Sequence, residues 1–260
     1  MDAARDRYAI AREALQALRI NAPNSGSLAS SVVVGGAARA EREPLQMSPP
    51  LSGILPEGGF PRGCVVELSS PGNLGHGMSV ALAACAASQA ESARAGRDKA
   101  WCAFLDPDQT LFGPALPERG VSLDRLLVLR PPRQLLSRVA VQVAAACIFS
   151  VIVVDVSSVA GASSREQHRF ESMETWSKVA RRLALSLEKT PTTLFLLTRT
   201  EAHRPLSLPV AMRLELENVN PDRLVVRIAK ERFGRVTSPR QIAWTRPDMV
   251  NRRMPVAGAR

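Results

Sequence analysis

Cysteine is scarce in this chain, and its spacing excludes the usual cysteine-based sites. The cysteines stand singly inside apolar runs, and no C-x-x-C pair is present. Neither a paired-cysteine metal site nor a disulfide framework is therefore expected. Isolated cysteines in apolar surroundings predict buried, reduced thiols, which are typical of a cytoplasmic protein. The four residues are Cys64, Cys85, Cys102 and Cys147.

Aromatic residues are also few, at 4% of the chain. Proteins that hold single-stranded nucleic acid stack its bases on aromatic side chains. The composition therefore argues against a strong single-strand platform.

Long apolar runs are missing too. The N-terminal sequence MDAARDRYAIAREAL lacks the apolar core of a signal peptide. The longest apolar stretch, residues 139–154, is interrupted by Gln142 and Ser150 and is too short to cross a bilayer. We therefore expect a cytoplasmic protein with no membrane partner.

Acidic residues are outnumbered by basic ones, 24 against 34, so the net charge is +10. The excess is concentrated from Arg223 onward, where ten basic residues accompany two acids. Such a distribution favours an acidic partner, either nucleic acid or an acidic protein surface. The alternative is a solvated basic region that only aids solubility.

The most informative segment is a phosphate loop that has lost its chemistry. Residues 64–68 form an apolar run, residues 69–75 are turn-forming, and residues 79–90 are rich in small helix formers. This strand–loop–helix order is the context that a phosphate-binding loop requires. In the G-x-x-x-x-G-K-[ST] pattern, the aligned positions hold Ser70, Gly75, His76 and Gly77.

Two chemical roles are missing from this loop. The Lys of the pattern contacts the β- and γ-phosphates, and its hydroxyl binds Mg²⁺. His76 is mostly neutral at pH 7 and Gly77 has no hydroxyl. Efficient ATP hydrolysis and a resident cofactor are therefore not expected. Weak binding of ADP or phosphate stays open through the backbone amides of Gly72, Asn73 and Gly75.

The rest of the chain alternates apolar runs with helical stretches, which predicts an α/β fold with a mostly parallel sheet flanked by helices. Past Pro209, residues 213–217 and 224–229 alternate apolar and charged positions, which predicts an antiparallel hairpin, and residues 241–245 are a candidate third strand. The predicted parallel strands are 64–68, 101–105, 126–129, 151–154 and 194–197, and the predicted helices are 79–95, 134–147 and 165–188.

Three regions follow from these patterns. Residues 1–50 are predicted to form an N-terminal helix, at 3–19, and a Ser/Gly/Pro-rich linker that continues to about residue 56. Residues 51–246 are the predicted core, and residues 247–260 are a basic tail.

Several motifs resemble the core of the RecA recombinase, in the same order and at comparable spacing. Residues 58–67 resemble the approach to its phosphate loop, and residues 103–108 resemble the strand that carries its catalytic carboxylate. Residues 120–127, 151–155 and 230–241 resemble, respectively, its G-V-D-I-D-N-L-L segment, its Walker B strand and its closing hairpin. Among RecA-like proteins, the chain resembles ImuA proteins, which are RecA/SulA-like accessory factors of inducible mutagenesis cassettes.

The resemblance gives roles to two carboxylates. Asp155 matches the Walker B acid that holds Mg²⁺ through water. Asp108 stands where the family has a water-activating Glu, but Asp is one methylene shorter, and catalysis is sensitive to such displacement. We therefore expect both carboxylates to be vestigial, with Asp155 capping the turn after its strand and Asp108 a relic or a turn residue. The alternatives are Mg²⁺ binding by Asp155 and catalysis by Asp108.

The resemblance also identifies basic contacts. Lys230 and Arg232 match lysines that reach across the RecA protomer interface to a neighbour's ATP phosphates, and Arg235 and Arg240 extend this basic hairpin. The alternative is an exposed hairpin with no partner. The second DNA-binding loop of RecA corresponds to the region of Arg199, His203 and Arg204.

Together these implications predict a non-hydrolysing RecA-like accessory protein in bacterial SOS DNA-damage tolerance, acting in translesion synthesis. The expected partners are RecA and an ImuB-like polymerase homologue, with an error-prone DNA polymerase III α subunit and non-specifically bound DNA as further candidates. Two alternatives stay open: a weak DNA-dependent ATPase that uses Asp108 and Asp155, and a SulA-type cell-division inhibitor.

Overall fold

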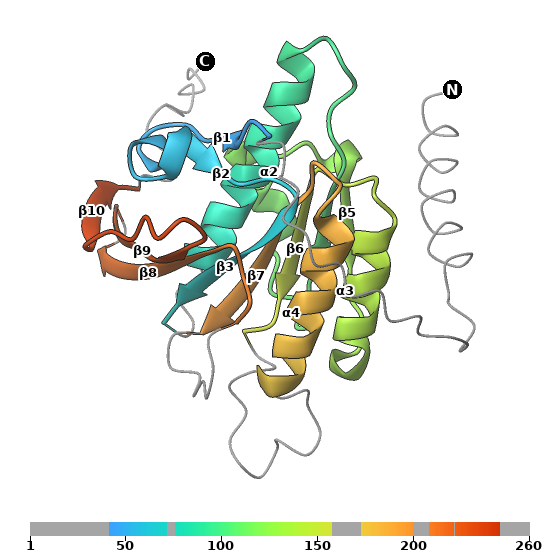
Figure 1. Cartoon of the computed structure of the whole chain (residues 1–260). Coiled ribbons are helices and arrows are strands. Elements are labelled where there is room, and N and C mark those ends of the chain that lie inside the picture. The colour runs from blue at the N-terminus through green and yellow to red at the C-terminus, as the bar shows by residue number, and fades with distance from the viewer. Residues whose placement is uncertain (1–41, 72–75, 158–172, 200–207, 221, 245–260) are drawn as a thin grey trace, which may run out of the picture.

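A mixed eight-stranded sheet forms the centre of the molecule (Figure 1), with the strand order β10-β9-β8-β3-β7-β6-β4-β5. Neighbouring strands from β8 to β5 are parallel, whereas β9 is antiparallel to both β8 and β10. The predicted α/β fold, with its mostly parallel sheet and C-terminal antiparallel hairpin, is therefore confirmed. The computed structural model describes residues 42–71, 76–157, 173–199, 208–220 and 222–244.

The observed strands lie close to the predicted ones. The described elements are the strands β1 (Leu45–Gln46), β2 (Gly59–Phe60), β3 (Cys64–Ser70), β4 (Cys102–Leu105), β5 (Leu126–Leu129), β6 (Val151–Asp155), β7 (Thr193–Arg199), β8 (Met212–Asn220), β9 (Arg223–Glu231) and β10 (Arg240–Ala243), and the helices α2 (His76–Arg94), α3 (Leu136–Ala145) and α4 (Met173–Leu187). Short 3₁₀ turns occupy Leu51–Gly53, Pro56–Gly58, Gly113–Ala115, Pro117–Arg119, Leu123–Arg125 and Arg133–Leu135.

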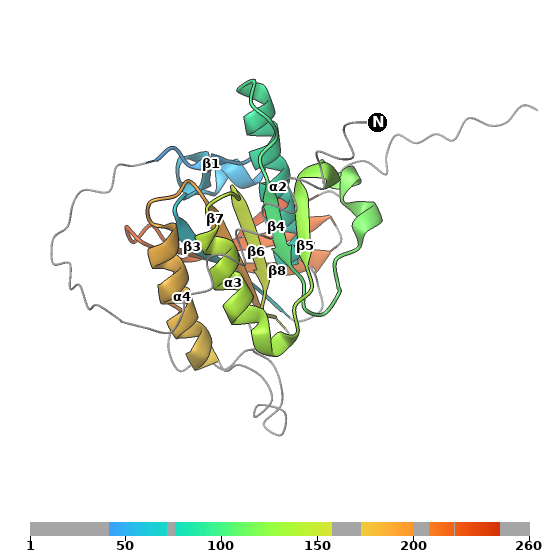
Figure 2. The ribbon, with the colours of Figure 1, turned by 90° about the vertical axis from the view of Figure 1, so that its right-hand side faces the viewer.

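Helices cover both faces of the parallel strands, which explains their continuous apolar sequences. In β3, Val66 and Leu68 pack in the apolar cluster that contains α2, whereas Val65 packs in the cluster that contains α3 and α4. Figure 2 shows α3 and α4 side by side over the sheet. Alternate side chains of one strand thus supply two separate hydrophobic cores.

The N-terminal boundary of the core was predicted too late in the chain. Leu45 in β1 pairs with Phe60 in β2, and both side chains are fully buried. Leu51 and Leu55 are buried as well, and the Phe60 ring meets Phe195 edge-on with a centroid distance of 4.9 Å. The core therefore includes residues 45–50, which had been predicted to be linker, because widely spaced leucines among Pro, Ser and Gly give no periodic signal.

Other predictions have mixed outcomes. Cys64, Cys85 and Cys102 are buried as predicted, but Cys147 is exposed, because it follows the end of α3 rather than lying within it. None of the helices described has the length and apolarity needed to cross a membrane. The predicted N-terminal helix, the basic tail and residues 165–172 of the third predicted helix lie outside the described residues.

The pairing of β1 with β2 leads to a stability prediction at Gly59. A Cβ atom there would lie 2.3 Å from the Leu45 carbonyl oxygen, whereas a Cβ at Gly113 would meet nothing within 4 Å. We expect Gly59→Ala to lower the free energy of unfolding by about 1–3 kcal/mol and Gly113→Ala to change it by less than about 0.5 kcal/mol. Urea denaturation of both variants measures the difference, and equal stabilities would contradict the close packing at Gly59.

Candidate phosphate-loop site and basic hairpin

The candidate phosphate loop lies at the carboxyl edge of the parallel strands, where open α/β sheets bind ligands. Strand β3 ends at Ser70 in the middle of the sheet, and α2 begins at His76. Strands β6 and β7 end at the same edge, because they run parallel to β3. Gly72, Asn73 and Gly75 lie outside the described residues, so the loop is known from Ser70, His76 and Gly77.

His76 is the first residue of α2, and its environment disfavours a positive charge. Burial lowers the pKa of the His76 imidazole, and the nearby positive charge of Arg119 lowers it further. The Nε2 atom is buried and makes no hydrogen bond to any described residue. At pH 7 this position therefore supplies a neutral ring where the phosphate-binding pattern has a cation.

Gly77 is buried, but the packing around it does not require a glycine. A Cβ atom there would lie 3.6 Å from Leu197 Cδ2 and 3.7 Å from both Leu68 Cβ and the Leu68 carbonyl oxygen. These are ordinary van der Waals distances, so a small side chain fits. Steric crowding at the Cβ therefore does not account for the missing hydroxyl.

Asp155 ends β6 and serves as an acceptor for the turn that follows. Its Oδ1 accepts hydrogen bonds from the Ser157 amide at 2.9 Å and the Ser157 hydroxyl at 2.6 Å. Burial raises the pKa of the Asp155 carboxyl, Asp108 and Asp106 raise it further, and the bonds from Ser157 partly oppose the shift. This is the geometry expected of a carboxylate that caps the turn after its strand.

Asp108 is bound by a cation of its own chain. Its Oδ1 accepts a hydrogen bond from Arg133 Nε at 2.6 Å and also pairs with Arg133 Nη2. Hydrogen bonds between a guanidinium and a carboxylate are charge-assisted and therefore stronger than neutral ones. Arg133, in the 3₁₀ turn before α3, had not been predicted as part of the site.

Asp106 is a site residue that the sequence analysis did not single out. It is fully buried and accepts hydrogen bonds from the amides of Thr110, at 2.9 Å, and Leu111, at 3.1 Å. The sequence feature that could have identified Asp106 is its position directly after the apolar strand 102–105. Asp106, Asp108 and Asp155 thus lie near one another but have separate partners, and within the described ranges no three His, Cys, Asp or Glu residues are placed to hold a metal ion.

A row of polar side chains crosses four neighbouring strands and also went unpredicted. Glu67 in β3 is fully buried, accepts a hydrogen bond from Thr198 Oγ1 at 2.7 Å and pairs with Arg213 Nε at 3.8 Å. Arg213 and Arg227 both contact Glu215, at 3.1 and 3.3 Å. The row links the parallel strands to the hairpin. The charged residues of this row are visible in the sequence, but which of them face one another depends on the register of β8 with β3 and β9.

The predicted basic residues of the hairpin differ in their contacts. Lys230 donates a hydrogen bond to the Leu208 carbonyl at 2.9 Å, whereas Arg232 is exposed, with its guanidinium carbon 4.6 Å from the Phe233 ring centroid. Arg235 pairs with Glu57 at 3.1 Å and with Glu231 at 3.4 Å. Arg240 is exposed at the start of β10.

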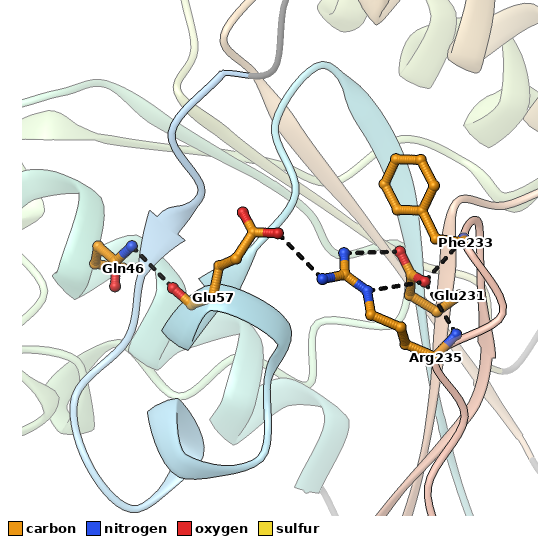
Figure 3. A network of polar contacts seen from close by, with 5 residues as sticks. All are labelled: Gln46, Glu57, Glu231, Phe233 and Arg235. Carbon is orange, nitrogen blue, oxygen red and sulfur yellow. Dashed lines mark hydrogen bonds and ion pairs between the residues drawn. The ribbon is translucent and has the colours of Figure 1, made fainter.

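Figure 3 shows that Arg235 joins two segments that are distant in the sequence. Its guanidinium lies between the carboxylates of Glu231 and Glu57, and the Glu57 carbonyl accepts a hydrogen bond from Gln46 Nε2 at 3.1 Å. Glu57 has a left-handed backbone, with φ of 55°. The network therefore holds the hairpin against the N-terminal segment of the core.

The basic turn between β9 and β10 and the phosphate loop lie at opposite ends of the strands: the turn is at the amino edge of the parallel strands and the loop is at their carboxyl edge. Glu231, at the end of β9, pairs with Met212, which in turn pairs with Val66 near the start of β3. The loop follows Ser70, at the other end of β3. Lys230, Arg232 and Arg235 are thus separated from their own chain's loop by the length of the strand.

The candidate DNA loop was predicted to involve three residues, Arg199, His203 and Arg204. Arg199 ends β7 at the carboxyl edge and is partly buried. His203 and Arg204 lie outside the described residues. No protein-family model matches the chain, and no curated protein is significantly similar to it.

The buried carboxyl of Asp155 predicts a pH-dependent stability difference. Because its pKa is raised in the folded state, folding favours the protonated acid, and this contribution is lost as pH rises from about 3.9 through the raised value. Asp155→Asn keeps the acceptor for Ser157 and carries no charge. We expect the variant to gain stability relative to the wild type as pH rises through this window, and to be the more stable protein at pH 7.

Urea unfolding of both proteins between pH 4 and pH 8 measures this difference. Ser186→Ala, near the C-terminal end of α4, is a suitable control, because it removes a hydroxyl without a charge. A difference between wild type and Asp155→Asn that does not change with pH would mean that the Asp155 carboxyl titrates normally.

Proposed function

We propose that this chain is a non-hydrolysing accessory protein with a RecA-like core, of the ImuA type, that acts in bacterial DNA-damage tolerance. It binds RecA and an ImuB-like polymerase homologue and modulates RecA filaments during translesion synthesis. An error-prone DNA polymerase III α subunit and DNA are further partners in this proposal.

The observation that carries the proposal is the separation of the basic hairpin from the phosphate loop. Lys230 and Arg232 lie at the amino edge of the parallel strands, and the loop lies at the carboxyl edge. Cations at this position cannot serve a nucleotide bound by their own chain. They are suited to a phosphate group bound by another molecule that packs against the amino edge.

The chemistry of the loop supports the same division of roles. His76 has a lowered pKa and Gly77 has no hydroxyl, so the loop lacks both the phosphate cation and the Mg²⁺ ligand. Loss of one charge-assisted contact costs about 1.5–3 kcal/mol, which is roughly a 10- to 150-fold loss of affinity. The chain thus keeps the cations that reach a neighbour and lacks those that hold its own nucleotide.

Such a subunit would stop a filament rather than extend it. A head-to-tail contact propagates only when both complementary faces of each subunit are functional. A subunit with a working amino edge and a defective loop attaches to one end of a RecA filament and offers no competent site to the next protomer. Modulation in this proposal consists of occupying an interface.

Restoring the loop tests the chemical half of the proposal. We expect the wild-type chain to hydrolyse no measurable Mg²⁺·ATP. We expect His76→Lys combined with Gly77→Ser to bind Mg²⁺·ATP at least about tenfold more tightly, because a small side chain fits at position 77. Titration calorimetry gives the affinities, and Gly77→Ser alone is the control for packing.

Magnesium-dependent turnover by the wild-type chain that disappears in Asp155→Asn would instead establish the alternative, a weak ATPase. The observation that favours this alternative is the position of Asp155 at the carboxyl end of a buried strand next to the loop. In the ATP turnover assay, the accessory protein is expected to show no measurable rate, whereas the weak ATPase is expected to show a magnesium-dependent rate.

Removing the hairpin cations tests the partner half of the proposal. We expect the wild-type chain to change the ATPase rate and the strand exchange of RecA. We expect Lys230→Ala with Arg232→Ala to require at least about tenfold more protein for the same effect, because two charge-assisted contacts are lost. Arg223→Ala is the matched control, since Arg223 is exposed at the opposite end of the same strand.

Thermal unfolding of the three proteins accompanies the assay, because Lys230 also donates a hydrogen bond to Leu208. Unchanged RecA inhibition or stimulation by the double variant would reject the role of these cations.

A further inference from the structure

The turn between β9 and β10 exposes an aromatic side chain in a protein that has few of them. Phe233 is 59% exposed and Val236 is 62% exposed, and both lie in the turn of residues 232–239. Gly234, between them, has a φ of +79°, which allows the tight reversal that directs this segment outward. We call residues 232–236 the hairpin tip.

The hairpin tip is held in its shape by a buried carboxylate. Glu231 accepts hydrogen bonds from the backbone amides of Phe233, at 2.8 Å, and Arg235, at 3.2 Å. Burial acts to raise the pKa of the Glu231 carboxyl, but hydrogen bonds from Arg235 and Phe233 outweigh it, so the pKa is lowered and the group is charged at pH 7. The turn is thus organised around an anion of its own chain.

Arg235 fixes the tip from a second side (Figure 3). Its guanidinium pairs with Glu231 and reaches Glu57, which belongs to the N-terminal segment of the core. A turn whose backbone is already held in place loses little conformational entropy when a partner binds it, which favours binding. Packing of the fold does not explain why Phe233 stands at this exposed position, because its side chain belongs to neither hydrophobic core.

Two guanidinium groups lie close to the Phe233 ring. The guanidinium carbons of Arg232 and Arg235 lie 4.6 and 5.3 Å from its centroid. Stacking of a nucleic-acid base requires a free ring face, and these groups compete for the faces. The arrangement is better suited to inserting the ring into an apolar pocket, with arginines at the rim, and aromatic and Arg side chains dominate the energetic centres of protein interfaces.

The charge around the tip specifies the partner's surface. Arg235 is paired with Glu231 and Glu57, which leaves Arg232 and Arg240 as the remaining exposed cations of residues 231–240. A complementary surface has acidic residues around an apolar pocket. The groove between residues 47–51 and α2 of a second copy, with a volume of about 470 Å³, is not such a surface, because its described lining includes Arg119 and no acidic residue.

We infer that the hairpin tip is the anchor by which this chain docks on an acidic protein surface, with Phe233 filling an apolar pocket and Arg232 pairing with an anionic group at its rim, whether a carboxylate or a bound phosphate. The inference rests on the proposed function, in which that surface belongs to a RecA protomer at a filament end. It adds an apolar anchor to the cationic contacts of Lys230 and Arg232 and makes the docking a protein–protein contact rather than a contact with DNA.

Phe233→Ala tests the anchor directly. Full-length protein is titrated into RecA filaments assembled on single-stranded DNA with a non-hydrolysable ATP analogue. We expect Phe233→Ala to weaken binding about 10- to 30-fold, Phe233→Trp to retain most of it, and Phe112→Ala to match the wild type. Phe112 is the matched control, because it is 69% exposed on a different segment.

The same titration at two salt concentrations tests the rim. We expect Arg232→Ala to weaken binding several-fold and to reduce its salt dependence, since an exposed ion pair is screened by salt. Binding of single-stranded DNA alone is measured for each variant, and we expect Phe233→Ala to leave it unchanged.

The outcomes separate the two proposals. If wild type and Phe233→Ala bind the filament equally, the anchor is overturned and the proposed function stands. If Phe233→Ala loses DNA binding and keeps filament binding, the tip is a nucleic-acid contact and the inference is overturned. If the wild type does not bind filaments at all, the proposed function fails, and this inference fails with it.

Discussion

The simultaneous pairing of β3 with β7 and β8 is the constraint on which the rest of the structure depends. One strand joins the parallel, doubly covered half of the sheet to the antiparallel hairpin. Its alternate side chains enter two different hydrophobic cores, so the position of α2 on one face and of α3 and α4 on the other follows from a single strand. The buried Glu67, between Thr198 and Arg213, fixes the same junction with polar contacts.

This junction also lies between the carboxyl and amino edges of the parallel strands, which differ in chemistry. At the carboxyl edge, a neutral His76 and a helix that starts without a hydroxyl follow β3, and each nearby carboxylate is engaged with its own partner. At the amino edge, the hairpin presents cations and an exposed aromatic held by Glu231 and Arg235. In the proposed adaptor, the first edge is inactive and the second edge makes the contact, which is a physical basis for a subunit that joins an assembly without extending it.

Most of the secondary structure was predictable because it depends on local patterns. The apolar runs at 64–68, 126–129 and 151–154 became β3, β5 and β6 with shifts of at most two residues, since a strand covered on both faces needs a continuous apolar sequence. The boundary near residue 45 was missed, because Leu45, Leu51 and Leu55 are brought together by a pairing with Phe60 that no local period signals. Asp106 was missed for the same kind of reason, since its role appears only when the turn at Thr110 and Leu111 folds around it.

The sequence by itself determined the order of the elements and the absence of a Lys and a hydroxyl from the loop, because residue identity and apolar periodicity are local properties. Only the tertiary structure decided which groups meet. In the folded chain, Asp108 pairs with Arg133 and Asp155 accepts hydrogen bonds from Ser157. The basic turn after β9 lies at the opposite end of the parallel strands from the phosphate loop. These outcomes depend on strand register and on the antiparallel return of β9, which are set by packing between segments far apart in the chain.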